Sequence, residues 1–234
     1  MNIIITGASK GIGFELVKVL CKHKQNQIVA ISRNGKALKE LAGECQRINP
    51  DAHVTPYEFD LQHFDFYPFL VQRLETIMHK CDILINNAGQ LLNKPFKKME
   101  QADFDDIFNV NVKSVFLLTQ ALLPILNHGA HIVNISSMGG VQGSKKFSGL
   151  AAYSASKGAV AVLTEVLAEE LMEDGIRVNC LALGSVQTEM FEKAFPGVKA
   201  TLNPQQMAHY IADFAVTGHK YFNGKIIPVS ISVP

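Results

Sequence analysis

Short β-branched runs alternate with longer amphipathic segments along the whole chain. The runs predict strands near 2–6, 27–31, 53–58, 82–86, 130–135, 176–182 and 225–229. Helices are predicted between them, near 11–24, 35–48, 64–80, 103–127, 152–174 and 204–217. Strand and helix alternate in this way when a parallel sheet is covered by helices on both faces. We therefore predict an α/β fold: one Rossmann-type, doubly wound domain over residues 1–234 with a seven-stranded parallel sheet.

The strands have the composition expected inside such a sheet. Ile83-Leu84-Ile85 is continuously apolar, as is typical of strands buried on both faces. Pro124 is expected to kink or shorten the end of helix 103–127. The least regular stretches, 138–151 and 184–203, both follow strands. Because open α/β sheets bind ligands at the carboxyl ends of their strands, these two loops are predicted to build the substrate site.

The charge balance favours a small-molecule partner. The formal net charge is +1, and the 22 basic residues are spread along the chain, so neither nucleic acid nor an anionic membrane is an expected partner. A strand begins directly after Met1, where a secretory signal would need a basic and then an apolar region. No segment reaches the roughly 18 uninterrupted apolar residues of a membrane span. We expect a cytoplasmic protein.

No metal site is predicted. The four cysteines, Cys21, Cys45, Cys81 and Cys180, are far apart in sequence, which favours reduced, partly buried thiols. His128 and His131 are expected to flank a turn rather than to hold zinc.

A glycine-rich turn, Thr6-Gly7-Ala8-Ser9-Lys10-Gly11-Ile12-Gly13, joins the first strand to the first helix. Its glycines remove side chains where the backbone turns tightly and approaches a pyrophosphate. The following helix start offers free N–H groups and the positive end of its dipole. A turn of this type in this position predicts a dinucleotide site.

The end of the second strand indicates which dinucleotide binds. A cofactor with a free ribose 2′-hydroxyl usually meets an acidic residue about 20 residues downstream, but here that place holds Ser32-Arg33. Arg33, together with Lys10, would pair with a 2′-phosphate, so we predict NADP(H) in preference to NAD(H). The alternative is that both are solvated surface cations.

Tyr153 and Lys157 stand four residues apart at the start of a predicted helix, so their side chains share one face. A free tyrosine has a pKa of about 10, and a nearby ammonium favours the phenolate and lowers that pKa. The pair could therefore form an acid that works near neutral pH. By itself the pattern Tyr-x-x-x-Lys is also common by chance.

Three further motifs occur in order: Asn86-Asn87-Ala88-Gly89 after the fourth strand, Asn109-Val110-Asn111-Val112 in the long helix, and Asn134-Ile135-Ser136-Ser137 after the fifth strand. With the glycine-rich turn and Tyr153-x-x-x-Lys157, these residues resemble the short-chain dehydrogenase/reductase family over nearly the whole chain. The resemblance is to 3-oxoacyl-acyl-carrier-protein reductases and carbonyl reductases in particular.

The resemblance implies four catalytic residues. Tyr153 would protonate the substrate oxygen, Lys157 would lower the tyrosine pKa and hold the nicotinamide ribose, and Ser137 would hydrogen-bond the carbonyl. Asn111 would hold a water that links Lys157 to solvent. The family places its serine three residues before a glycine, which Ser137 and Gly140 match, so Ser136 is interpreted as strand-end structure.

The cofactor contacts follow from the turn and from the same resemblance. Asp60-Leu61 matches the adenine-contacting pair, Asn87 to Gly89 match the segment beside the adenosine ribose, and Val186 with Thr188 resembles the stretch at the nicotinamide carboxamide. The predicted positions are Gly7, Ser9, Lys10, Gly11, Ile12, Gly13, Ser32, Arg33, Asp60, Leu61, Asn87, Ala88, Gly89, Tyr153, Lys157, Gly184, Val186 and Thr188.

The chain departs from the family in three places. Leu183-Gly184 replaces the common Pro-Gly after the sixth strand, and an insertion, 143–147, lies before Tyr153. Lys145 and Lys146 in that insertion could attract an acidic substrate or belong to a solvated turn. The carboxyl end lacks the usual Asp-Gly-Gly, so we expect a homodimer through helices 103–127 and 152–174 more than a homotetramer.

These features together predict an oxidoreductase, an NADPH-dependent carbonyl reductase that transfers a hydride between nicotinamide and a ketone, an aldehyde or the corresponding alcohol. Its pocket would be lined by apolar residues, namely Met138, Phe147, Leu150, Met190, Phe191 and Phe195. Two alternatives are a non-catalytic NADP(H)-binding sensor or scaffold, and an epimerase or dehydratase with tightly held NAD.

Overall fold

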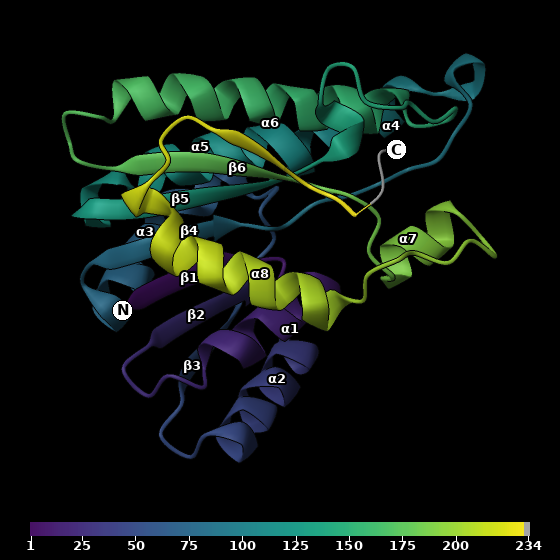
Figure 1. Cartoon of the computed structure of the whole chain (residues 1–234). Helices are drawn as coiled ribbons and strands as arrows, with labels where there is room; N and C mark the ends of the chain where they lie inside the picture. Colours follow the sequence, from purple (N-terminus) through teal and green to yellow (C-terminus); the bar gives the residue numbers. More distant parts are fainter. Residues whose placement is uncertain (232–234) are drawn as a thin grey trace.

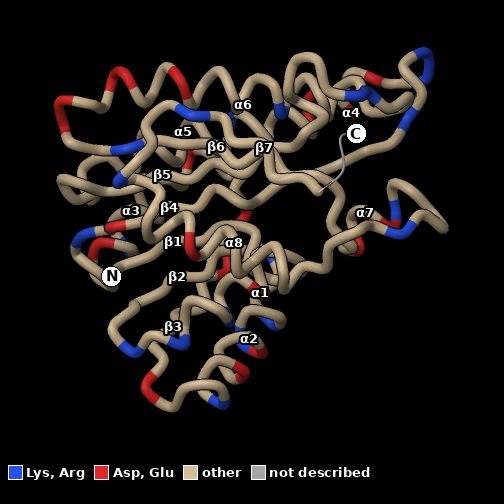
Figure 2. The backbone as a smooth tube through the Cα atoms, in the orientation of Figure 1, with Lys and Arg blue, Asp and Glu red and all other residues tan. Residues whose placement is uncertain are grey.

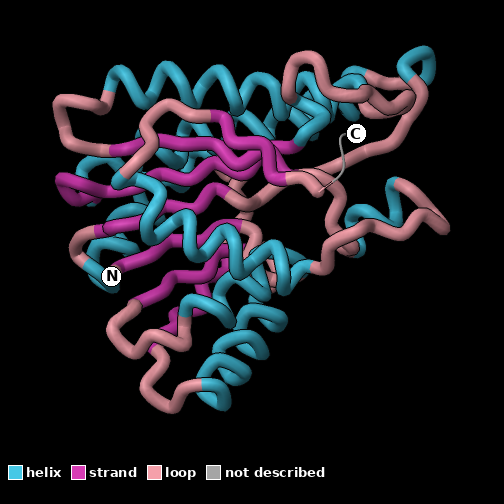
Figure 3. The backbone as a smooth tube through the Cα atoms, viewed as in Figure 1, coloured by secondary structure: helices cyan, strands magenta, loops and turns pink. Residues whose placement is uncertain are grey.

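A computed structural model of the protein describes residues 1–231. Seven parallel strands form one sheet in the order β3-β2-β1-β4-β5-β6-β7 (Figures 1 and 3). The strands are β1 (Asn2–Thr6), β2 (Gln27–Ser32), β3 (His53–Glu58), β4 (Cys81–Asn86), β5 (Leu126–Ser137), β6 (Arg177–Leu183) and β7 (Ile226–Val229). The predicted fold class, a doubly wound Rossmann-type sheet, is confirmed.

Helices cover both faces of the sheet (Figure 1). On one face lie α1 (Gly11–Leu20), α2 (Gly35–Ile48) and α8 (Pro204–Thr217). On the other face lie α3 (Tyr67–Met78), α5 (Ser114–Leu122) and α6 (Ala151–Glu170). Helix α4 (Gln101–Phe108) precedes α5, and the short helix α7 (Glu189–Ala194) follows β6.

The first strand shows how the sheet forms two cores. Ile3 and Ile5 belong to the cluster under α1, α2 and α8, whereas Ile4 belongs to the cluster under α3, α5 and α6. Successive strand side chains point to opposite faces, so a run of apolar residues contributes to both cores. The continuously apolar strands are therefore buried on both sides, as predicted.

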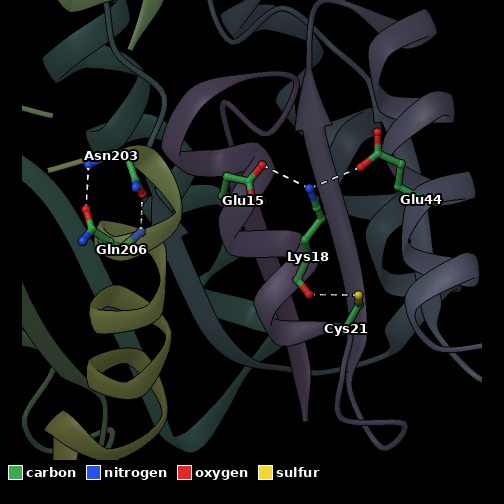
Figure 4. A network of polar contacts seen from close by, with 6 residues as sticks. All are labelled: Glu15, Lys18, Cys21, Glu44, Asn203 and Gln206. Atoms are coloured by element: carbon green, nitrogen blue, oxygen red, sulfur yellow. Dashed lines mark hydrogen bonds and ion pairs between the residues drawn. The ribbon is translucent and has the colours of Figure 1, made fainter. Parts of the chain in front are cut away.

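Polar contacts fix the helices on the first face (Figure 4). Lys18 of α1 lies between two carboxylates, with its Nζ 3.1 Å from Glu15 and 3.3 Å from Glu44 of α2. At the start of α8, Asn203 and Gln206 form a reciprocal capping box that satisfies two helix-terminal N–H groups. The ion pair of Lys18 with Glu44 joins α1, which begins in the glycine-rich turn, to α2.

The long predicted helix 103–127 is divided. Helix α4 leads into a π-helical turn, η3 (Asn109–Lys113), and α5 then ends at Leu122 in a 3₁₀ turn, Leu123–Ile125. The 3₁₀ turn contains Pro124, and this confirms that the proline shortens the helix. The π-helical turn was not predicted, and residues 126–127 belong to strand β5 rather than to the helix.

Loop 184–203 also differs from the prediction, because it contains helix α7. Thr188 caps this helix by accepting a hydrogen bond of 3.2 Å from the N–H of Phe191. Six residues are too few for a clear helical period, so the sequence pattern did not reveal the helix.

The helical run Gln101–Ile125 is long and apolar enough to cross a membrane by length and composition. Leu118 and Leu122 of this run are buried in the core that α5 shares with α3. Packing in the α/β core therefore accounts for the apolar residues on this face of the run. All four cysteines are buried and have free thiols.

Candidate active site

A cavity of about 780 Å³ lies at the carboxyl ends of the strands. Its walls come from the glycine-rich turn, from the ends of β2, β4, β5 and β6, from the loop before α6, and from the loops on either side of α7. Every predicted catalytic and cofactor residue lines this cavity except Asn111. The six predicted apolar lining residues, from Met138 to Phe195, also line it.

The glycine-rich turn needs its glycines. Gly7 has φ +68°, and a Cβ there would lie 2.7 Å from the Cα of Ala88. A Cβ on Gly13 would overlap the carbonyl oxygen of Gly7, because the first helix approaches the strand closely. A side chain at either position would fill the cradle, so the turn fits a pyrophosphate at the N-terminus of α1.

Residues after β4 hold this turn in place. The Thr6 hydroxyl accepts hydrogen bonds from the N–H groups of Asn87 (3.1 Å) and Ala88 (3.0 Å). The side-chain amide of Asn87 donates to the carbonyl oxygens of Thr6 (2.9 Å) and Gly7 (3.3 Å). Asn87 therefore positions the glycine-rich turn from the neighbouring strand.

The two cations predicted to select NADP(H) both lie beside carboxylates. Lys10 Nζ is 3.1 Å from Glu189 Oε2 at the start of α7, and Arg33 is 4.0 Å from Asp60 Oδ2. The Arg33 side chain is 67% exposed, so this pair is loose and its guanidinium is accessible from the cavity. Lys10 lies toward α7, which is a contact that the sequence did not predict.

Tyr153 and Lys157 both lie on the first turns of α6, as their spacing predicted. Lys157 is 5% exposed, and its Nζ donates a hydrogen bond of 2.8 Å to the carbonyl oxygen of Ile135. The same Nζ is 6.0 Å from the centroid of the Tyr153 ring. The ammonium thus lies between the end of β5 and the tyrosine.

Burial changes the acidity of this pair. Desolvation lowers the pKa of Lys157 from 10.5 to about 8. Desolvation also raises the pKa of Tyr153, and a hydrogen bond with Ser137 opposes that rise. The net shift of the Tyr153 pKa in this arrangement is therefore upward, with desolvation as its largest cause. The lowering of that pKa by Lys157 beside a bound nicotinamide stays a prediction.

The two serines at the end of β5 have different partners. Ser137 lines the cavity, hydrogen-bonds Tyr153 and accepts a bond of 3.2 Å from the N–H of Gly139. Ser136 is buried, and its hydroxyl donates to the carbonyl oxygen of Lys157 at 2.8 Å. Ser136 therefore connects β5 to α6, and Ser137 is the serine available to a substrate.

Close packing at Gly140 explains why a glycine stands three residues after Ser137. A Cβ at Gly140 would lie 2.5 Å from the carbonyl carbon of Lys157 and 2.6 Å from the nitrogen of Gly158. The backbone after Ser137 thus packs directly on the helix that carries Tyr153 and Lys157. Any side chain at this position would move the serine away from the tyrosine.

Asn111 lies in the π-helical turn η3 and is fully buried. Its Oδ1 accepts from the N–H of Gln90 at 2.7 Å, and its Nδ2 donates to Gln90 O and to Ser156 Oγ, both at 2.9 Å. The Ser156 hydroxyl in turn donates to the carbonyl oxygen of Tyr153 at 2.7 Å. Asn111 therefore supports the tyrosine helix from behind the cavity.

Asn93, which no sequence motif indicated, joins the two loops beside the cavity. Its Nδ2 donates a hydrogen bond of 2.8 Å to the carbonyl oxygen of Ala194, the last residue of α7. On its other side, Gly149 (φ +87°) approaches so closely that a Cβ there would overlap Asn93 Oδ1. A lone asparagine in a loop carries no sequence signal for such contacts.

The turn after β6 is maintained without proline. Gly184 N–H donates a hydrogen bond of 2.9 Å to Val229 O at the end of β7, and a Cβ on Gly184 would lie 2.5 Å from Ser230 Oγ. Contact with the last strand thus fixes the start of the loop that leads to Val186 and Thr188, in place of the fixed φ of proline.

Comparison with known proteins agrees with this geometry. The family model described as short chain dehydrogenase matches residues 1–199. The chain is 30% identical over 238 residues to the 3-oxoacyl-acyl-carrier-protein reductase of Thermotoga maritima, covering 97% of this chain and 94% of that protein. An uncharacterized oxidoreductase of Staphylococcus saprophyticus is 32% identical over 209 residues, with 88% and 86% covered.

Two solved structures are similar over nearly the whole chain. One is a short chain dehydrogenase of Escherichia coli CFT073 in complex with NADPH, with a TM-score of 0.88 and 28% identity, covering 97% of this chain and 95% of that one. The other is a Shigella flexneri short chain dehydrogenase in complex with NADP, with a TM-score of 0.89, 27% identity and the same coverage.

Proposed function

The chain belongs to the short chain dehydrogenase family and is an oxidoreductase, and from this premise we propose that it is an NADPH-dependent carbonyl reductase. It would transfer a hydride to a ketone or aldehyde, or in the reverse direction from the corresponding alcohol. The observation that carries the proposal is that Ser137, Tyr153 and Lys157 share one cavity with the glycine-rich turn.

The residues of the chain have separate tasks in this proposal. Bound NADPH supplies the hydride. Tyr153 and Ser137 place two hydroxyl groups beside the carbonyl oxygen, where negative charge develops, and Tyr153 gives its proton to that oxygen. Lys157 holds positive charge beside the tyrosine and binds the nicotinamide ribose. Asn111 would hold the water that links Lys157 to solvent, and through Ser156 it also positions the tyrosine helix.

The preference for NADP(H) rests on Arg33 and Lys10. A 2′-phosphate would compete with Asp60 for the exposed Arg33 guanidinium. The phosphate is favoured because it can bind the guanidinium through two oxygens and carries more negative charge than the carboxylate. The two similar structures in complex with NADP and NADPH support the same choice. We expect Arg33→Ala to raise the KM for NADPH far more than the KM for NADH, and equal effects would refute this assignment.

The substrate would enter between loops 138–151 and 184–203, which carry the apolar lining. Phe147 of the first loop and Phe195 of the second meet edge to face, with ring centroids 5.9 Å apart. Both rings line the cavity, so an apolar or amphiphilic carbonyl compound fits best.

A homodimer through α4, α5 and α6 is part of the same proposal. Phe104 and Phe116 are exposed on the first two helices, and Val162 and Val166 are exposed on α6. Exposed apolar groups on adjacent helices are typical of a subunit interface. Sedimentation of the purified protein tests the dimer, and cell fractionation tests the proposed cytoplasmic location.

The test of the function is NADPH oxidation over a panel of acetoacetyl thioesters, diketones, quinones and pterins, with Tyr153→Phe measured alongside. The variant is expected to lose about 3 kcal/mol or more of transition-state stabilisation on each active substrate, because its acid is gone. Full activity in the variant would refute the role of Tyr153. Tightly retained NAD after dialysis would favour an epimerase or dehydratase, and exchangeable NADPH without turnover would favour a sensor.

A further inference from the structure

The cavity carries more positive charge than the chain as a whole, whose formal net charge is +1. Its charged lining consists of five cations and two carboxylates, namely Lys10, Arg33, Lys145, Lys157 and Lys199 with Asp60 and Glu189. Figure 2 shows that acidic and basic residues are otherwise interspersed along the chain. A cleft with an excess of one charge concentrates ligands of the opposite charge.

The excess charge is located at the substrate end of the cavity. At the cofactor end, Glu189 pairs with Lys10 and Asp60 with Arg33. The buried Lys157 bonds to a backbone carbonyl. Lys145 and Lys199 are exposed, and within residues 1–231 neither has a carboxylate oxygen within 4.0 Å of its Nζ.

These two lysines line the same cavity as the aromatic pair Phe147 and Phe195. Lys145 Nζ is 5.6 Å from the centroid of the Phe147 ring, which contacts Phe195. Phe195 O accepts a hydrogen bond of 3.1 Å from the N–H of Val198, and Lys199 follows directly. One cation therefore comes from each of the two loops whose phenylalanines meet in the cavity wall.

Lys146, the neighbour of Lys145, is engaged differently. Its Nζ donates to the carbonyl oxygen of Val141 and to Ser144 Oγ of its own loop. It does not line the cavity. Of the two lysines in the insertion, the structure therefore leaves Lys145 available to a ligand.

We propose that the substrate is a carbonyl compound whose apolar body ends in an anionic group, a carboxylate or a phosphate, and that Lys145 and Lys199 bind this group. The inference rests on the proposed function and narrows its substrate class. The carbonyl lies at Tyr153 and Ser137, the apolar body lies along Phe147 and Phe195, and the anionic end meets the two ammonium groups. The two lysines determine specificity and take no part in hydride transfer.

The experiment compares straight-chain oxo acids of increasing length with their methyl esters and with phosphate-terminated analogues. Lys145→Met and Lys199→Met remove the charge and keep most of the apolar stem. Lys193→Met on α7 is the matched control, because Lys193 is a nearby lysine that does not line the cavity. The KM for each substrate and for NADPH is measured at low and high salt.

The wild-type enzyme is expected to prefer the anionic substrate to its ester. Each of the two variants should raise the KM for the anionic substrate about three- to fivefold, the size expected for a solvent-accessible ion pair. The KM for the ester, the KM for NADPH and all values for Lys193→Met should stay unchanged. High salt should reduce the preference, because it screens exposed charges. The carboxylate and phosphate series show which anion binds more tightly.

Three results would overturn the inference: equal kcat/KM for acid and ester in the wild type, equal losses on both substrates in the variants, or a raised KM for NADPH alone. The failure of the proposed function is distinct from these. It would appear as no NADPH-dependent reduction of any carbonyl, neutral or anionic, whereas reduction of esters without preference for the acids overturns only the present inference.

Discussion

The ammonium of Lys157 and the carbonyl oxygen of Ile135 are joined by a hydrogen bond of 2.8 Å, which connects the catalytic helix α6 to the end of strand β5. Ile135 stands two residues before Ser137, so this contact places the lysine, the serine and the tyrosine relative to one another. It also holds a positive charge in a site where desolvation disfavours it.

The lowered pKa of Lys157 predicts a pH dependence of stability. In the folded protein the pKa is about 8, against 10.5 as the ordinary value. Between these values the unfolded chain binds the extra proton, so the free energy of unfolding should rise from pH 8 to pH 10.5, by about 3 kcal/mol at most. Urea unfolding over this range should show the rise in the wild type and lack it in Lys157→Met. Parallel curves for the two proteins would contradict the assignment.

Ser137 and Ser136 form a matched pair for testing the site. Ser137→Ala should lower kcat/KM about 100-fold, because a donor to the developing oxyanion is lost, with little change in stability. It should also raise the pKa of Tyr153 further, measured by ultraviolet titration of tyrosinate, since their hydrogen bond opposes the effect of burial. Ser136→Ala should instead cost about 1 kcal/mol of stability through its lost bond to Lys157 O. A reversed pattern would show that Ser136 is the catalytic serine.

Adding one methyl group is expected to have opposite effects on stability at Gly140 and at Gly43. Gly140→Ala would push a Cβ into the backbone of α6, so a loss of about 1–3 kcal/mol of stability and a large loss of activity are expected. At Gly43, inside the exposed part of α2, a Cβ meets no atom within 4 Å, and Gly43→Ala should stabilise the protein by about 0.5–1 kcal/mol. Thermal unfolding of both variants tests this, and a neutral Gly140→Ala would show that the two segments are not in close contact.

His131 is expected to limit stability in acid. This buried side chain accepts a bond of 3.1 Å from Asn179 Nδ2 at Nε2 and donates one of 2.9 Å from Nδ1 to Ala215 O, a neutral tautomer assigned from these partners. Burial lowers its pKa from 6.5 to about 4, and the neighbouring His219 adds to this.

Because the unfolded chain takes up the proton first, the free energy of unfolding should fall as the pH drops from 6.5 to 4, by about 3 kcal/mol in total. His131→Gln keeps an amide without a titrating group, so its curve should be flatter over the same range. Identical slopes for the two proteins would remove His131 as the cause.

Asn93 is predicted to position α7 for substrate binding. Asn93→Ala removes the bond to Ala194 O, so the KM for the carbonyl substrate should rise several-fold while kcat and the KM for NADPH stay nearly constant. Asn127→Ala is the control, since Asn127 bonds Asp82 near the amino ends of β5 and β4, away from the cavity. Equal changes in the two variants would mean that the effect is one of stability alone.

The amino-acid sequence determined the alternation of strands and helices, because side-chain periodicity is a local property of the order of residues. It also determined the glycine-rich turn and the pairing of Tyr153 with Lys157, whose spacing fixes their common helix face. Motif spacing selected Ser137 over Ser136, and Gly140 supplies the physical reason, since its missing side chain lets β5 approach α6.

Only the tertiary structure decided the pKa shifts, ion pairs and loop contacts, because these depend on neighbours from distant parts of the chain. The upward shift of the Tyr153 pKa by desolvation is one such property, because desolvation is produced by the whole packed interior and not by the residue four positions away. The contact of Lys10 with Glu189, the role of Asn93 and the separate positions of Lys145 and Lys146 likewise arise where loops meet. Sequence patterns record which residues share a helix or strand, whereas burial and charge pairing are set by the neighbours that folding supplies.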